Sequence, residues 1–200
     1  MKKVMVYTRF ERFWHWAQAA LIISLLITGF NIHGTYNLLW FSKAAQLHNW
    51  AAYALIGLWV LAIFWHFTTG QWRQYLPTSK QLGAVIHYYV IGTFTGAEHP
   101  FRPTTDAKHN PLQRLAYLWF KLMISPLIWI SGLLYLFYGQ RHELGYAHIP
   151  LEYIALTHTA AAYMMLVFLI AHVYMGTMGK SVFSLLKPML TGYEVKERKD

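Results

Sequence analysis

Residues 156–175 read LTHTAAAYMMLVFLIAHVYM, an uncharged apolar run that contains two histidines, His158 and His172. The run lies within a longer apolar segment, from about residue 151 to 175. A helix of roughly 20 residues crosses the hydrocarbon core of a membrane, so this segment is long enough to span it. Ionisable side chains inside a span are costly and usually functional. The segment therefore predicts a transmembrane helix with two functional histidines.

Three more apolar segments have a similar length, at about residues 13–32, 47–67 and 112–137. Together the four segments predict an all-α membrane protein, a four-transmembrane-helix bundle in which residues 1–200 form a single domain. The first segment lacks a cleavage site for signal peptidase at the usual place, so we expect it to be retained. Pro126 interrupts the third segment and is expected to kink it. A shorter apolar stretch, residues 82–94, is expected to lie along the membrane interface as a helix.

The composition agrees with a membrane location. Hydrophobic residues make up 56% of the chain and charged residues 12%, against roughly 25% charged residues in soluble domains. Cysteine is absent, which excludes disulfides and iron–sulfur ligation by this chain. The basic residues lie between the apolar segments, which is typical of membrane topology and not of nucleic-acid binding.

The distribution of lysine and arginine predicts the orientation. These residues gather before the first segment, between the second and third, and after the fourth, whereas the two short loops carry only Lys43 and Arg141. Basic residues favour the cytoplasmic side. Both termini and the loop 68–111 are therefore predicted to be cytoplasmic, and the loops 31–46 and 138–150 periplasmic. This topology predicts a multi-pass protein of the bacterial inner (cytoplasmic) membrane.

The histidines can be paired by depth. His158 and His172 are 14 residues apart, which places them roughly 21 Å apart along a helix and on nearly the same face. Helix direction places His48 at the level of His158, near the periplasm, and His15 at the level of His172, near the cytoplasm. A single membrane histidine is more often a packing residue, but two matched pairs favour two b-type haems. Two imidazoles per iron leave no open position for a substrate, which is typical of electron transfer.

His66 is an alternative ligand. It follows His48 by 18 residues, five helical turns, and so lies on the same face at a distance of roughly 27 Å. This distance is longer than the 21 Å between His158 and His172, so the level of His66 matches that of His172 less well than the level of His15 does. We therefore predict His15 as the ligand, with His66 as the competing residue.

Two motifs resemble a known family. Residues 9–16, RFERFWHW, and residues 156–162, LTHTAAA, followed by HVYM at 172–175, resemble the first and fourth helices of the cytochrome b (gamma) subunit of membrane formate dehydrogenases. The thiosulfate reductase and Ni-Fe hydrogenase cytochrome b subunits are similar at lower specificity. The resemblance covers nearly the whole chain. It implies a bacterial dihaem cytochrome b, with the four haem ligands at positions 15, 48, 158 and 172.

The same resemblance implies a quinone site. Residues 108–114, KHNPLQR, resemble the loop with which the family binds quinone near the cytoplasmic haem, and they assign Asn110 and Gln113 to menaquinone or ubiquinone. Leu112 stands where the family has a small residue. The alternative is that Asn110 only caps the third helix, with Pro111 at its first position.

The resemblance implies a respiratory oxidoreductase complex, in which this subunit transfers electrons and reacts with quinone while a partner carries out substrate catalysis. Because the chain has no cysteine, the expected partner is a periplasmic iron–sulfur or multihaem c-type cytochrome subunit. Membrane lipid is expected around the helices and no nucleic acid is expected. Two alternatives stay open: a self-contained transmembrane cytochrome of the b561 type, and a proton or solute transporter with a histidine relay.

Overall fold

The computed structural model describes residues 2–101, 104, 107–179 and 181–196. Within them four helical segments are long and apolar enough to cross a membrane, as predicted. These segments are α1 (Arg9–Ile32), α2 (Phe41–Thr69), the combined segment Pro111–Leu136, and α7 (Leu151–Thr177). The second predicted segment is the least accurate, because α2 begins at Phe41 and not near residue 47.

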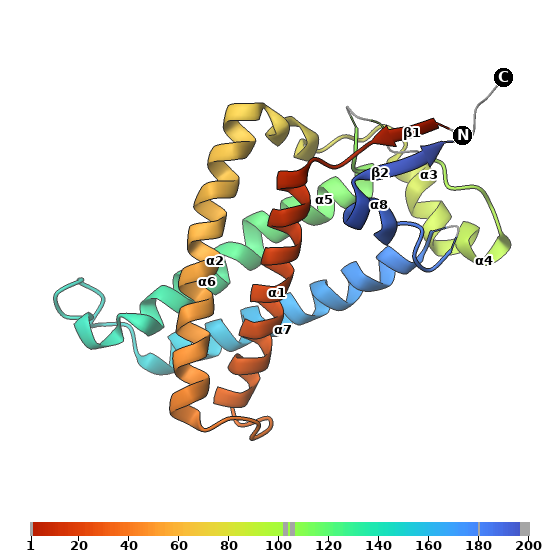
Figure 1. The fold of residues 1–200 in the computed structure, drawn as a ribbon. Helices are drawn as coiled ribbons and strands as arrows, with labels where there is room; N and C mark the ends of the chain where they lie inside the picture. The colour runs from red at the N-terminus through yellow and green to blue at the C-terminus, as the bar shows by residue number, and fades with distance from the viewer. Residues whose placement is uncertain (1, 102–103, 105–106, 180, 197–200) are drawn as a thin grey trace.

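The long helices form two hairpins. α1 packs along α2 as far as the turn that joins them, and α6 (Ser125–Leu136) packs along α7 (Figure 1). The chain therefore alternates in direction through the four segments. This alternation brings the start of α1 and the end of α7 to one end of the bundle.

The start of α1 is fixed by its cap. Thr8 Oγ1 accepts a hydrogen bond from the Glu11 backbone at 3.3 Å, and Glu11 Oε2 accepts one from the Thr8 backbone at 2.7 Å. This reciprocal capping box satisfies backbone donors that a helix start leaves unpaired. It places the start at Arg9, four residues before the apolar run that predicted the helix.

The third membrane segment is not a regular helix. It consists of α5 (Pro111–Trp119), a π-helical turn η3 (Phe120–Ile124), and α6. Pro126 lacks a backbone N–H and cannot bond to the carbonyl four residues before it. A π-helical turn that ends at Ile124, two residues before the proline, is one way in which a helix accommodates such a break. The disturbance predicted at Pro126 therefore takes the form of a π turn.

Smaller elements cover the end of the bundle where α1 begins. They include the short helix predicted at residues 82–94, and a two-stranded antiparallel sheet that the sequence analysis did not predict (Figure 1). The sheet ties the start of the described chain to its end. The elements are η1 (Gln71–Tyr75), α3 (Leu82–His87), the π turn η2 (Tyr88–Gly92), α4 (Thr93–Thr95), α8 (Leu186–Thr191), β1 (Lys2–Met5) and β2 (Tyr193–Lys196), with the 3-10 turn η4 (Tyr138–Gln140) in the loop after α6.

The protein core is small and lies at mid-depth. Its buried members are Phe120, Ile124 and Met165, with Trp59 and Phe168 among the side chains packed against them. Met165 lies seven residues from His158 and seven from His172. Most other apolar side chains of the long helices are exposed or only half-buried, as expected where lipid takes the place of water. The core therefore separates the two histidine levels of α7.

Candidate functional site

The four predicted histidines meet as two pairs. The ring centroids of His48 and His158 are 6.3 Å apart, and those of His15 and His172 are 6.1 Å apart. Each pair joins one helix of the first hairpin, α2 or α1, to α7. The pairing is the one that helix direction predicts.

The two pairs fit a haem iron. Two imidazoles that bind one metal through a nitrogen each, with bonds of about 2.0 Å, have centroids roughly 6 Å apart. No group of three or more metal-ligating side chains occurs among the residues that the structure describes. Each pair therefore offers two nitrogen donors, and the porphyrin of a bound haem would supply the remaining ligands. Imidazole is a suitable ligand for iron.

A hydroxyl on α1 holds the ring of His48. Thr28 Oγ1 lies 3.0 Å from His48 Nδ1 and 2.7 Å from the carbonyl oxygen of Ser24. Because the hydroxyl donates its one hydrogen to the carbonyl, Oγ1 accepts from Nδ1–H. The other ring nitrogen, Nε2, then carries the free lone pair that a metal needs.

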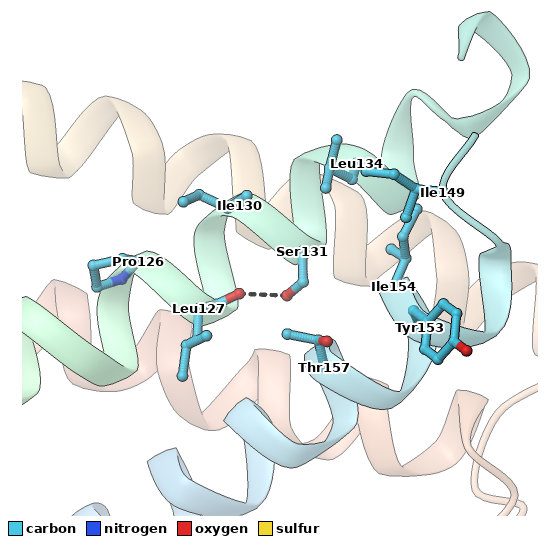
Figure 2. A pocket seen from close by; sticks show the side chains of 9 residues that line it. All are labelled: Pro126, Leu127, Ile130, Ser131, Leu134, Ile149, Tyr153, Ile154 and Thr157. Carbon is cyan, nitrogen blue, oxygen red and sulfur yellow. Dashed lines mark hydrogen bonds between the residues drawn. The ribbon is translucent and has the colours of Figure 1, made fainter. Parts of the chain in front are cut away.

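The same arrangement recurs at His158. Ser131 Oγ on α6 lies 3.1 Å from His158 Nδ1, and its hydroxyl donates to the carbonyl of Leu127. Figure 2 shows the bond from Ser131 to Leu127 beside a pocket between α6 and α7. The volume of this pocket is about 210 Å³. Apart from Ser131, Thr157 and Tyr153, the side chains that line this pocket are apolar. The Ser131 hydroxyl is therefore held in apolar surroundings.

A glycine follows each hydroxyl residue and lies against the same ring. A Cβ atom on Gly29 would lie 3.3 Å from His48 Cε1, and one on Gly132 would lie 3.1 Å from His158 Cε1. Both distances are shorter than ordinary van der Waals contact. The two rings can approach α1 and α6 this closely because these positions carry no side chain.

The pair His15–His172 has different surroundings. His15 Nδ1 is buried and has no hydrogen-bond partner among the described residues. The ring of Phe168 stacks on His172, with centroids 6.1 Å apart and planes 11° apart. Buried polar atoms are nearly always paired, so the unpartnered Nδ1 of His15 sets this pair apart from His48 and His158, whose Nδ1 atoms each contact a hydroxyl.

His66 does not belong to either pair. Its Nδ1 bonds to the carbonyl of Ala62 at 2.6 Å. Its ring contacts Trp14 and Tyr75, with centroids 5.1 and 5.5 Å away. The structure therefore brings His15, and not His66, against His172.

Asn110 and Gln113 form the cap of α5. Asn110 Oδ1 accepts from the Gln113 backbone at 2.8 Å, and Gln113 Oε1 accepts from the Asn110 backbone at 2.9 Å. Asn110 Nδ2 donates to Tyr89 Oη at 3.3 Å. Since an amide nitrogen has two hydrogens, one donor of Asn110 is not used by these bonds. The capping role is thus present in the structure, and the quinone role stays a prediction.

A buried ion pair fixes this cap beside the start of α1. Lys108 Nζ lies 2.6 Å from Glu11 Oε1, with both side chains almost fully buried. Glu11 is one helical turn before His15, so the pair brings the start of α5 to the end of the bundle that holds His15 and His172. Next to Lys108, burial lowers the pKa of His109 to about 4, with Arg114 and Lys108 contributing in the same direction. His109 is therefore neutral at pH 7.

The chain matches the sequence profile of a family described as "Prokaryotic cytochrome b561" over residues 6–192. The chain belongs to the prokaryotic cytochrome b561 family. It is also similar to a protein of Escherichia coli (strain K12) named "Putative cytochrome YdhU", with 29% identity over 198 residues that cover 96% of this chain and 75% of that protein. No solved structure matches. The comparisons identify a b561 cytochrome, and the narrower likeness to formate dehydrogenase subunits stays a prediction.

The residues that contact the rings of His48 and His158 were not predicted from the sequence. They are two dipeptides of a hydroxyl residue and a glycine, Thr28-Gly29 and Ser131-Gly132. Each lies in the helix that precedes a histidine-bearing helix of this b561 cytochrome. Their signal is a polar residue and a helix-weakening glycine side by side in an apolar span, at the depth of a candidate ligand.

Proposed function

We propose that this chain is a dihaem b-type cytochrome subunit that carries electrons across the bacterial inner membrane, between a periplasmic redox subunit and the quinone pool. Membership in the prokaryotic cytochrome b561 family implies haem b, transmembrane electron transfer and a multi-pass membrane location. The observation that carries the proposal of two haems is the presence of two interhelical histidine pairs, with centroids 6.3 and 6.1 Å apart.

The residues of the chain have separate roles in this function. When bound, haem supplies reversible one-electron chemistry. His48 and His158 would hold one iron, and His15 and His172 would hold the other. With two protein ligands on each iron, no position would be left for a substrate to bind it directly. The apolar helices exclude water from both sites.

The quinone site would lie at the start of α5. Asn110 has one amide hydrogen that its cap and Tyr89 do not use, and a quinone carbonyl in an apolar pocket needs such a donor. The Lys108–Glu11 pair supports this location, because it connects the start of α5 to the turn of α1 before His15. Menaquinone or ubiquinone would exchange protons with the cytoplasm here, and Gln113 would hold Asn110 in place.

Quinone-linked reduction tests this function. A reduced quinol analogue is expected to reduce the haems of the purified protein, seen as the α-band of a b-type cytochrome. Asn110→Asp keeps the helix cap but removes the amide donor, so both haems should remain while the rate of reduction falls about tenfold, the value of one hydrogen bond of about 1.4 kcal/mol.

The control is Asn37→Asp, which makes the same change at an exposed loop position. It should leave the rate unchanged. A wild-type rate in the Asn110 variant would restrict this residue to capping. No reduction of the wild-type protein by quinol would contradict the quinone role as a whole.

The orientation with both termini cytoplasmic is part of the proposal. The pairing of β1 with β2 supports it only in placing the two ends of the described chain on one side. A reporter that is active only in the periplasm should be silent when fused after residue 200 and active when inserted in the loop before α2, near Lys43. The reverse pattern would invert the topology and exchange the periplasmic and cytoplasmic pairs.

A self-contained b561 cytochrome, supplied by a small soluble donor, is equally consistent with the family match. Co-purification distinguishes the two functions, because only the subunit of a complex should retain an iron–sulfur or multihaem partner after mild solubilisation. The same family match favours either cytochrome over a histidine-relay transporter.

A further inference from the structure

We infer that Thr28 and Ser131 are positioning residues for His48 and His158, and that Gly29 and Gly132 provide the room in which they act. The inference rests on the proposed haem at this pair. The two hydroxyls fix which ring nitrogen faces the iron, and they lower the reduction potential of this haem and not of the other.

The hydrogen bonds determine the tautomer of both rings. At His48, the hydrogen of Thr28 is taken by the Ser24 carbonyl, so Nδ1 must be the donor to Oγ1. The carbonyl of Leu25, 3.3 Å from the same Oγ1, is a second acceptor for this hydrogen. Because Oγ1 has no hydrogen left to donate to the ring, the ring proton stays on Nδ1 and Nε2 is free to bind iron.

His158 has the equivalent arrangement. Ser131 Oγ lies 3.1 Å from Nδ1, and its own hydrogen is taken by the backbone carbonyls of Leu127 and Ile128, at 2.5 and 3.4 Å. Thus two helices that differ in sequence present the same kind of acceptor to the two rings, a hydroxyl whose hydrogen is already donated to its own helix. This repetition on both faces of one candidate iron site is what indicates a role in ligation.

The glycines explain how the bonds are reached. Gly29 and Gly132 lie in regular helix, so no unusual backbone angle requires glycine there, and glycine weakens a helix. Glycine is required at these positions because a Cβ atom would lie only 3.3 Å from the His48 ring at Gly29 and 3.1 Å from the His158 ring at Gly132. Gly57, in the interior of α2, is different, since a Cβ there would meet nothing within 4 Å.

The bonds should lower the reduction potential of one haem. An imidazole whose N–H donates to an acceptor is a more basic ligand, and a more basic ligand favours ferric iron. The pair His15–His172 lacks such a bond at His15, whose Nδ1 has no partner among the described residues. Loss of Thr28 or Ser131 should therefore raise the potential of the haem at His48–His158 and leave the other unchanged.

A redox titration of the purified holoprotein, followed by its visible spectrum, tests the inference. Thr28→Val and Ser131→Ala should each shift the potential of one of the two haems upward, and Thr28→Ser, which retains the hydroxyl, should restore the wild-type value. Ser24→Ala is the matched control. It removes a hydroxyl one turn earlier on α1 that bonds only to the Ala20 carbonyl, so it should shift neither haem.

The second haem reports on folding in the same sample. Unchanged potentials in both variants, or equal shifts of both haems, would overturn the inference. A wild-type protein that holds fewer than two haems would contradict the proposed function instead, so the two failures are distinguishable.

The glycines are tested by haem retention on gel filtration. Gly132→Ala, with the shorter contact, should lose more haem than Gly29→Ala, and Gly57→Ala should retain the wild-type amount. Equal retention in all three variants would contradict the role assigned to the glycines.

Discussion

Extraction with acid-acetone is expected to release two haems per polypeptide from the purified protein, and only one from the variant His158→Ala. The reason is geometric, because the two histidine pairs are independent of each other. His48–His158 and His15–His172 lie at levels of α7 that are separated by the packed core around Met165. Removing His158 eliminates half the protein ligands of one iron and leaves the other pair intact.

The controls are two exposed histidines of the loop before α7, His142 and His148. Replacing either with alanine should leave two haems, because neither belongs to a pair. Haem that resists extraction, or one haem per wild-type chain, would be incompatible with the two-site arrangement. The content is measured as pyridine haemochromogen against protein concentration.

The sequence was sufficient for the membrane helices because their signal is strong. A span of about 20 apolar residues has few other stable structures in a chain of this size. The start of α1 was predicted too late because its first turn carries Arg9, Glu11 and Arg12, which hydropathy excludes from a span. The capping box at Thr8 extends the helix over this charged turn, which hydropathy alone cannot register.

The sheet of β1 and β2 shows a different limit. It pairs Lys3 with Val195, two residues from opposite ends of the chain. β1, KKVM, has no alternation of apolar and polar residues, and β2, YEVK, alternates over only four residues, the shortest length that can mark a strand. Its formation depends on helices that bring the two ends together, so it follows from the fold and not from the local sequence.

The histidine pairs could be predicted because depth in a membrane is a simple coordinate. Helix direction and the rise per residue fix the level of each side chain, and four histidines at two levels form two pairs. To predict which side chains surround the rings, the rotation of each helix about its axis must be known as well as the depth of each residue. Thr28 and Ser131 contact the histidines only because α1 and α6 turn these faces toward α2 and α7.

Variants of His15 and His66 are expected to differ clearly in their haem content. The variant His15→Ala should lose the haem at His172 and keep the other, which halves the haem content. His66→Ala should retain both haems. The physical reason is that His15 lies 6.1 Å from His172 by ring centroids, whereas His66 bonds through Nδ1 to the Ala62 carbonyl and packs against Trp14 and Tyr75.

The haem content of both variants should be measured after one purification protocol, together with the low-spin spectrum. Imidazole added to His15→Ala should restore that spectrum in part, because the free ligand can occupy the space that the side chain leaves. The same addition to His66→Ala should change nothing. If His66→Ala loses a haem while His15→Ala retains both, then α2 supplies ligands at both levels, and the ring contact between His15 and His172 is packing alone.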